Sequence, residues 1–234
     1  MFGKKIKGPI DLHMEENQFC AVWQEEARNC VHTLRVNAPS DHYTLLFQDG
    51  KCVGMPQENG GPLYPFSVDP RREGSRSDKK TFGSAKAVCI SSTYEFRVPW
   101  GTNSKYTVFE NGRAFDVGAS GTFFVAIDGK DAGKNAQKFY RTMLSHGNAA
   151  EMDTKKIRDK LRDQFHLVIG EAIEKSLKTF GRPYDALIAL TPSELRQISA
   201  ILFKEVQTVF EDHGLAFTPG TINSLLGNLL IERH

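Results

Sequence analysis

Several things are scarce in this chain of 234 residues, and each scarcity excludes a class of protein. Lysine and arginine number 30 and aspartate and glutamate 28, so the formal net charge is only +2. No strong overall field therefore directs the protein to nucleic acid or to an anionic membrane. The sequence contains no apolar run near the roughly 20 residues that a membrane-spanning helix needs, and residues 1–14 lack the apolar core of a secretory signal peptide. We expect a cytoplasmic globular protein.

Cysteine is also scarce: the chain has four, Cys20, Cys30, Cys52 and Cys89, at wide and uneven spacing. No two of them have the C-x-x-C spacing of a zinc site or redox motif, and no histidine doublet stands near them. In a reducing compartment such cysteines are most simply small, buried apolar residues. The sequence predicts no metal site.

The motifs that mark common enzymes are missing. The chain has no G-x-G-x-x-G, no Walker A loop, no G-x-S-x-G turn and no H-E-x-x-H helix. The seven histidines are scattered, and adjacent acidic pairs such as Glu25-Glu26 point in different directions on any regular element. Residues 118–121 loosely resemble a phosphate-binding turn, but they lie between two β-type runs and favour a kink or bulge in a strand. We expect no catalytic and no cofactor-binding residues.

The first half of the chain is a series of strand signals. Two dipeptides typical of tight hairpin turns, Asp49-Gly50 and Asn111-Gly112, stand between β-type runs over residues 42–54 and 105–117. Residues 87–98 and 121–127 are two further β-type runs. Residues 69–86 show no apolar periodicity and predict a loop.

The second half has the periodicity of helices. We expect a short helix over residues 131–144, and apolar residues at three- and four-residue steps predict a long one over residues 153–180, ended by Gly181. Residues 191–194 have the pattern of a capping box and predict the start of another helix. Gly214 is expected to close that helix, and residues 215–217 to add a last strand.

Strands followed by helices predict a single α+β domain, with packed helices on one side of a mostly antiparallel sheet. The chain is rich in phenylalanine, with 16 against 6 tyrosines and 2 tryptophans. Most of these rings are expected to line the core between sheet and helices. They are Phe47, Phe96, Phe109, Phe115, Phe123 and Phe124 on predicted strands, and Phe139, Phe165, Phe180, Phe203 and Phe210 on predicted helices.

The N-terminus has a pattern that suits a membrane surface. Phe2, Ile6 and Ile10 recur at four-residue steps, as on the apolar side of an interfacial helix, although Pro9 limits such a helix to two turns. Basic residues accompany them, and three such charges give only marginal, reversible binding. The residues expected to contact a membrane are thus Phe2, Lys4, Lys5, Ile6, Lys7 and Ile10. A frayed or edge-packed terminus is the alternative.

Two groups of charged residues are candidates for partner binding. The loop 69–86 has an excess of three positive charges and could contact an anionic partner through Arg71, Arg72, Arg76, Lys79 and Lys80. Single-strand nucleic-acid binders interleave aromatic with basic residues, and Phe82 is the only aromatic here, so nucleic acid is an unfavoured partner. The start of the long helix carries a second group, which suits either a contact between protomers or a solvated surface: Lys155, Lys156, Arg158, Lys160, Arg162 and Asp163.

Four segments, in this order, are similar to one known superfamily. The first is residues 34–54, a strand pair followed by Gly61-Pro-Leu-Tyr64, and the second is residues 94–102 with the motif Trp-Gly-Thr. The third is residues 118–144, a strand and then a short helix, in which Asp128-Gly129 stands where relatives have Asp-Pro. The fourth is residues 157–222, a long helix, a short helix, a further helix and Gly214-Leu215 before a final strand.

On these segments the chain resembles the SPFH, or band 7, superfamily of stomatin- and prohibitin-like proteins, most closely its soluble bacterial virion-core-protein-like branch. The resemblance implies an SPFH-like domain over residues 34–226, preceded by a partly amphipathic segment, 1–33, and followed by a tail, 227–234. It implies a non-catalytic scaffold that forms homo-oligomers, with no cofactor, cytoplasmic or peripheral at the inner face of the cell membrane. The alternative is a binding module that uses the loop 69–86 for nucleic acid or another anionic partner.

Overall fold

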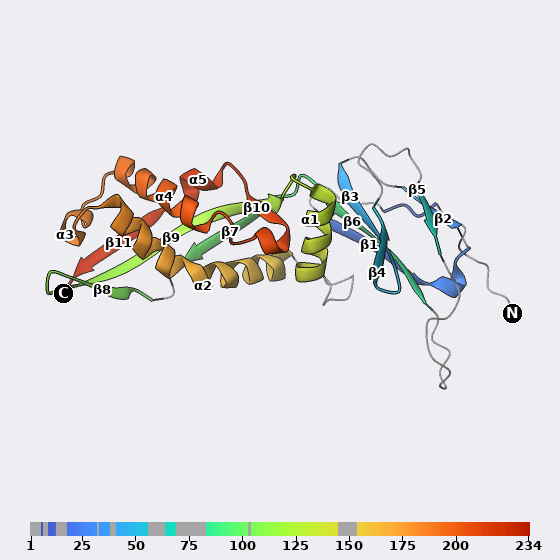
Figure 1. The fold of residues 1–234 in the computed structure, drawn as a ribbon, viewed down its shortest axis with the longest axis horizontal. Helices are drawn as coiled ribbons and strands as arrows, with labels where there is room; N and C mark the ends of the chain where they lie inside the picture. The colour runs from blue at the N-terminus through green and yellow to red at the C-terminus, as the bar shows by residue number, and fades with distance from the viewer. Residues whose placement is uncertain are drawn as a thin grey trace, which may run out of the picture. The chain divides into compact units, whose positions relative to one another are not determined.

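The computed structural model describes residues 6, 9–12, 18–31, 33–37, 41–55, 64–68, 83–102, 104–144 and 154–234. The chain forms two compact units, and each is described by itself (Figure 1). Unit 1 comprises Met1–Tyr94 and Gly129–Met152, and unit 2 comprises Glu95–Asp128 and Asp153–His234. The sequence predicted a single domain over residues 34–226, and both units include residues outside that range. Residues 20–26 and 228–233 form strands that pair with strands inside it. The α+β class with antiparallel sheets is confirmed.

Unit 1 contains two antiparallel sheets. The larger has the strand order β1-β6-β3-β4, and the smaller pairs β2 with β5. The bounds are β1 Cys20–Glu26, β2 Thr33–Val36, β3 His42–Gln48, β4 Lys51–Gly54, β5 Tyr64–Ser67 and β6 Ser84–Ser91, with a single turn, η1, at Ala27–Asn29. The hairpin predicted over residues 42–54 is confirmed, since Asp49 and Gly50 both have positive φ, 51° and 76°.

Other elements pack on both faces of the larger sheet of unit 1. Ala85, Ala87 and Cys89 alternate along β6 and pack into one core with residues of β2, including Leu34. On the other face lies helix α1 (Ala132–Phe139), continued by the π-helical turn η2 (Tyr140–Leu144), as the sequence predicted for residues 131–144. Phe47 of β3 meets Tyr140 there, with ring centroids 4.6 Å apart.

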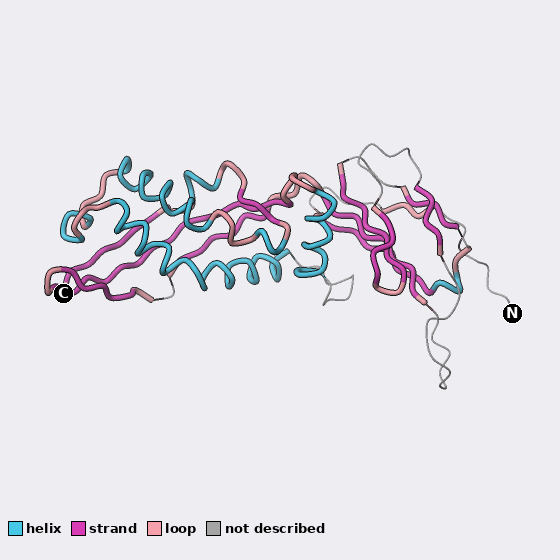
Figure 2. The backbone as a smooth tube through the Cα atoms, in the orientation of Figure 1, coloured by secondary structure: helices cyan, strands magenta, loops and turns pink. Residues whose placement is uncertain are grey.

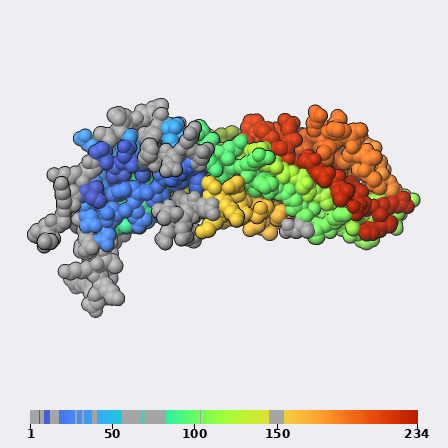
Figure 3. All heavy atoms as spheres, turned by 180° about the vertical axis from the view of Figure 1, so that it is seen from behind, coloured from blue at the N-terminus to red at the C-terminus, as the bar shows by residue number. Residues whose placement is uncertain are grey.

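Unit 2 is organised around one strand of 15 residues, β9 (Arg113–Ile127). Along one edge β9 pairs with β8 (Tyr106–Glu110) and β7 (Phe96–Gly101), and along the other with β11 (Asn228–Arg233) and β10 (Leu215–Phe217), all antiparallel. The hairpin at Asn111-Gly112 and the strand over residues 215–217 are confirmed. Figure 3 shows the red C-terminal strand β11 on the surface of this unit.

Two strand predictions need correction. Residues 113–117 and 121–127 are one strand, because the ladder to β11 runs without a register shift through Gly118 and the ladder to β7 continues it from residue 120. A kink or bulge at residues 118–121 is therefore wrong. The predicted run over residues 87–98 is two strands, β6 and β7, since the chain leaves unit 1 for unit 2 between Tyr94 and Glu95.

Helices cover one face of the sheet of unit 2 (Figure 2). They are α2 Thr154–Phe180, α3 Tyr184–Leu187, α4 Pro192–Val206, α5 Thr221–Ser224 and the single turn η4 Glu211–His213. Phe165 of α2 meets Phe123 of β9 and Trp100 of β7 at centroid distances of 4.7 and 5.3 Å. Phe210 also contacts Phe123. Alternation along β9 then places the odd-numbered residues toward the helices and the even-numbered ones on the outer face.

The predicted helix ends hold, with one exception. Gly181 has φ of 78° after α2, and Thr191 with Glu194 forms the complete capping box of α4. Helix α4 ends at Val206, so Gly214, with φ of 70°, closes η4 rather than α4. Of the phenylalanines predicted in the core, Phe109 is the clear exception, because 80% of its surface is exposed.

Candidate functional site

The N-terminal residues predicted to contact a membrane do not form a helix where the structure describes them. Ile6 forms an isolated parallel bridge with Cys30, and Ile10 forms one with Val36. The amide of Ile10 donates a hydrogen bond of 2.7 Å to the carbonyl of Arg35. The Ile10 side chain is buried in the core of unit 1, so it is not available to lipid. Phe2, Lys4, Lys5 and Lys7 lie outside the described residues.

The basic loop falls largely outside the part of the chain that the structure describes. This holds for all five residues proposed to contact an anionic partner, Arg71, Arg72, Arg76, Lys79 and Lys80. Lys86, at the end of the predicted loop, is instead part of β6, a central strand of the larger sheet of unit 1.

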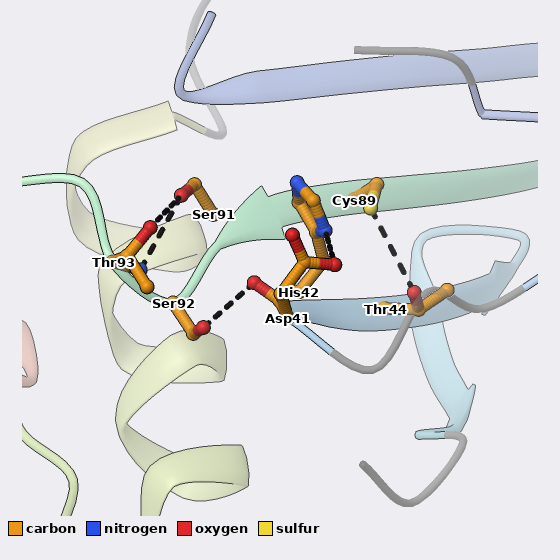
Figure 4. A network of polar contacts seen from close by, with 7 residues as sticks. All are labelled: Asp41, His42, Thr44, Cys89, Ser91, Ser92 and Thr93. Carbon is orange, nitrogen blue, oxygen red and sulfur yellow. Dashed lines mark hydrogen bonds and ion pairs between the residues drawn. The ribbon is translucent and has the colours of Figure 1, made fainter. Parts of the chain in front are cut away.

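A polar network joins the ends of β3 and β6 (Figure 4). Nδ1 of His42 lies 2.7 Å from Oδ1 of Asp41, and this hydrogen bond holds the pKa of the Asp41 carboxyl below its usual range. The Ser92 hydroxyl donates to the Asp41 carbonyl at 2.6 Å. Further along the strands, the Thr44 hydroxyl donates to the thiol sulfur of Cys89, whose pKa burial raises to about 11. Cys89 is therefore a neutral thiol near pH 7 and a poor nucleophile.

In the same network a carboxylate forms a hydrogen bond with an imidazole, and such a bond orients a histidine that acts as a general base. Ser91 stands opposite His42 in the ladder between β3 and β6. Its hydroxyl lies 3.3 Å from the hydroxyl of Thr93 and accepts from the Thr93 amide. These bonds tie the strand ends to the segment that leaves unit 1, and this role suits a structural network better than a nucleophile.

The outer side of α2 carries the charges that the sequence singled out. Lys155, Lys156, Arg158, Lys160 and Asp163 are exposed, and Arg162 is half-buried with its guanidinium 2.7 Å from Asp159. Among them stands Leu167, 84% exposed, four residues after Asp163 and therefore on the same side of the helix. Sequence periodicity did not single out Leu167.

The outer face of the sheet of unit 2 is a mixed surface. Phe109 of β8 projects from it, 80% exposed. Asp116 of β9 accepts from the Thr107 hydroxyl at 2.7 Å, and Nε2 of His234 lies 2.7 Å from its other oxygen. The Thr107 bond, and after it His234, hold the pKa of Asp116 below its usual range. Thr107, Phe109 and Asp116 belong to the hairpin that the sequence predicts, whereas His234 comes from the end of the chain and is brought beside them only by the fold.

A pocket of about 310 Å³ lies where α2 ends, beside the β8–β9 turn. Leu177 and Pro183 line it, together with the charged side chains of Glu110, Lys178 and Arg182. The charges are already engaged: Lys178 with Glu174, Arg182 with Glu194, and Glu110 with the amide of Tyr184. The pocket therefore offers little free charge to a ligand.

Two phenols in unit 2 are buried without a partner among the described residues. They belong to Tyr106 of β8 and Tyr184 of α3. Burial raises the pKa of both, and the nearby Glu174 carboxylate adds to the effect. Both hydroxyls stay neutral near pH 7. The stacking of Tyr184 on Phe115 fits a role in packing.

The described residues contain no group of three or more His, Cys, Asp and Glu side chains that could hold a metal ion. Within the same part of the chain, no helix is both long and apolar enough to cross a membrane. All four cysteines are free thiols, and Cys20, Cys30 and Cys89 are buried as expected.

No protein-family model matches the chain, and neither a curated protein nor a solved structure does.

Proposed function

We propose that this chain is a non-catalytic scaffold of the SPFH, or band 7, type, which assembles side by side with copies of itself. The order of its elements supports the proposal: antiparallel strands lead into a long helix, a short helix, a further helix and a strand after Gly214. That order agrees with the four segments on which the sequence resembles the superfamily.

One observation carries the self-association. Unit 2 exposes a large apolar side chain on each of two opposite layers, Leu167 on the helices and Phe109 on the outer face of the sheet. Phe109 stands opposite Ala114 of β9, an even-numbered position, whereas α2 packs on the odd-numbered side. A contact with another copy would remove both side chains from water, which favours association.

Two different surfaces on opposite sides of one unit favour a heterologous contact. In such a contact the Leu167 surface of one copy covers the Phe109 surface of the next. The copy at one end then has a free Phe109 surface and the copy at the other end a free Leu167 surface, so further copies can add. Repetition then produces a ring or an open row rather than a closed dimer. This is the side-by-side assembly that a scaffold requires.

The compartment and the membrane clause are part of the proposal. Four free thiols suit a reducing cytoplasm. Since Ile10 is buried, peripheral attachment to the inner face of the membrane would use Phe2, Lys4, Lys5 and Lys7. Three basic side chains contribute about 1 kcal/mol each near an anionic surface, so attachment is weak for one copy and is strengthened when copies assemble.

The heterologous contact is tested by mixing two variants, Leu167→Asp and Phe109→Asp, in sedimentation velocity runs over a concentration series. Wild type should form large oligomers, and each variant alone should stay monomeric. An equimolar mixture should give a dimer and nothing larger, because one intact surface of each kind remains. Ile188→Asp, at a side chain 50% exposed elsewhere on unit 2, is the matched control and should assemble as wild type does. A wild type that stays monomeric at high concentration would refute the proposal.

The membrane clause has its own test. Flotation with vesicles containing phosphatidylserine should recover wild type, and a variant with Lys4, Lys5 and Lys7 changed to Glu should remain at the bottom of the gradient. Equal flotation of the two would remove the clause and leave the assembly unaffected.

A further inference from the structure

Lys86 occupies a position where an apolar side chain is expected. It lies on β6, between β1 and β3, directly opposite Phe47 in the ladder. Phe47 and Val88, which share this face, are 3% and 0% exposed. Long side chains keep their charge in water where they can, and a lysine aimed at the helix-covered face of a central strand is an exception to the pattern of the sheet. Such exceptions are common at functional sites.

The ammonium of Lys86 contacts a tyrosine rather than a carboxylate. Nζ donates a hydrogen bond of 2.6 Å to the hydroxyl of Tyr140 and lies 5.1 Å from the centre of the same ring. Tyr140 is 8% exposed and begins the π-helical turn η2, a feature that is frequent at functional sites. Because the hydroxyl oxygen accepts from Lys86, its own hydrogen remains available to donate.

Within the part of the chain that the structure describes, no carboxylate compensates the charge of Lys86. No carboxylate of the described residues forms an ion pair with it. Residues 132–144, which cover this face, include Lys134, Lys138 and Arg141 and no acidic residue, and Asp131 just before them lies 3.6 Å from Lys134. The remaining hydrogen bonds of a partly buried ammonium are completed by water or by an anion, and an anion also balances its charge.

We propose that Lys86 and Tyr140 form a binding site for a single oxyanion group, a phosphate or a carboxylate. Two N–H groups of the ammonium and the O–H of the phenol, 2.6 Å apart at their heavy atoms, are left to donate to the oxygens of such a group. Lys86 is partly exposed, so the anion reaches the site from solvent. The proposal stands apart from self-association, which concerns surfaces of unit 2.

The site is tested on the full chain by following the side-chain NMR signals of ¹³C-labelled lysines during titration with inorganic phosphate. The Lys86 signal, assigned by its loss in Lys86→Arg, should shift along a saturable curve. Lys134 is the control in the same unit, since it is exposed and 3.6 Å from Asp131, and its signal should not saturate. A Lys86 signal that shifts only linearly, in parallel with that of Lys134, would overturn the proposal.

A second variant separates the site from general attraction by charge. Tyr140→Phe keeps the ring and every charge and removes only the O–H donor, so it should weaken phosphate binding at least fivefold. An unchanged affinity would show that the phenol takes no part and would overturn the two-residue site. Circular dichroism and the dispersion of the other lysine signals confirm that each variant is folded.

The source of the oxyanion is distinguished by comparing phosphatidic acid vesicles with phosphatidylcholine vesicles. If a lipid headgroup is the ligand, Lys86→Met should reduce flotation with phosphatidic acid, and Lys134→Met should not. If the ligand is a free anion, the affinity of wild type for inorganic phosphate should be the same with either kind of vesicle present, and Lys86→Met should float as wild type does.

Discussion

The indole nitrogen of Trp100 donates a hydrogen bond of 2.9 Å to the main-chain carbonyl of Leu225, and both residues are buried. Trp100 stands opposite Gly121 in the ladder between β7 and β9. A Cβ atom at Gly121 would lie 1.9 Å from the same carbonyl oxygen. The segment after α5 can therefore approach the sheet, because Trp100 supplies a hydrogen-bond donor and Gly121 has no side chain.

Gly121→Ala should destabilise unit 2 by about 2 to 3 kcal/mol, because the added methyl overlaps main-chain atoms that cannot rotate away. Gly129→Ala is the matched control, since a Cβ there meets nothing within 4 Å, and it should change the free energy of unfolding by less than about 0.5 kcal/mol. Urea denaturation followed by circular dichroism measures both. Equal stabilities would contradict the close approach at Leu225.

Trp100→Phe should cost about 1 to 3 kcal/mol, since the buried carbonyl of Leu225 loses its donor. The control is Trp23→Phe in unit 1, because Trp23 forms no hydrogen bond through its indole with any described residue and its ring is only partly buried. The difference between the urea midpoints of the two variants measures the contribution of the hydrogen bond. A larger loss of stability in Trp23→Phe than in Trp100→Phe would contradict that contribution.

Ile10→Ala should lower the free energy of unfolding by about 2 to 4 kcal/mol, as expected for a buried isoleucine. Ile222→Ala, at a side chain 40% exposed, should cost far less. Thermal melting in the absence of lipid compares them. An interfacial helix would give the opposite result, with Ile10 contributing to vesicle binding and nothing to stability in solution.

His213 should make stability depend on pH. Burial, and after it the field of Lys160, lowers the pKa of this imidazole below its ordinary value in the unfolded chain. Between the two pKa values the unfolded chain binds more protons, so stability should decline as the pH falls below about 6.5 and level off beneath the folded pKa. His213→Gln should flatten this part of the urea midpoint curve between pH 7.5 and 5. An unchanged slope would contradict a partly buried imidazole whose pKa is lowered in the folded chain.

Local signals in the sequence located most of the elements. The positive φ angles at Asp49-Gly50 and Asn111-Gly112 and the capping box at Thr191 depend on residues a few positions apart, so the printed order of residues suffices to predict them. The division into two units was not predicted, because residues 87–98 have the pattern of one β-type run although the chain changes unit between Tyr94 and Glu95.

At Ile6 and Ile10 the edge-packed alternative holds instead of the interfacial helix, for a physical reason. Ile6 and Ile10 are four residues apart, which places them on one side of a helix but also on one side of an extended segment, whose period is two. The parallel bridges to Cys30 and Val36 select the extended form, and both depend on pairing with distant residues. Phe109 was likewise predicted in the core, and Leu167 was not singled out. The exposure of each side chain depends on which elements pack above it.

The contact between Lys86 and Tyr140 could not be predicted at all. The two residues are separated by 54 positions, and the chain forms β7, β8 and β9 of the other unit between them. Only the pairing of β6 with β3 and the position of η2 bring the ammonium to the phenol.

The interleaving of the two units also governs the order in which they can be completed. During synthesis from the N-terminus, β6 emerges first, and the helix that covers it follows only after three strands of unit 2 have been made. Unit 2 in turn remains unfinished until its last strand, β11, has been made. A nascent chain thus leaves one face of the larger sheet of unit 1 uncovered until residues 132–144 have been made, and no single proteolytic cut of the finished protein can free either unit whole.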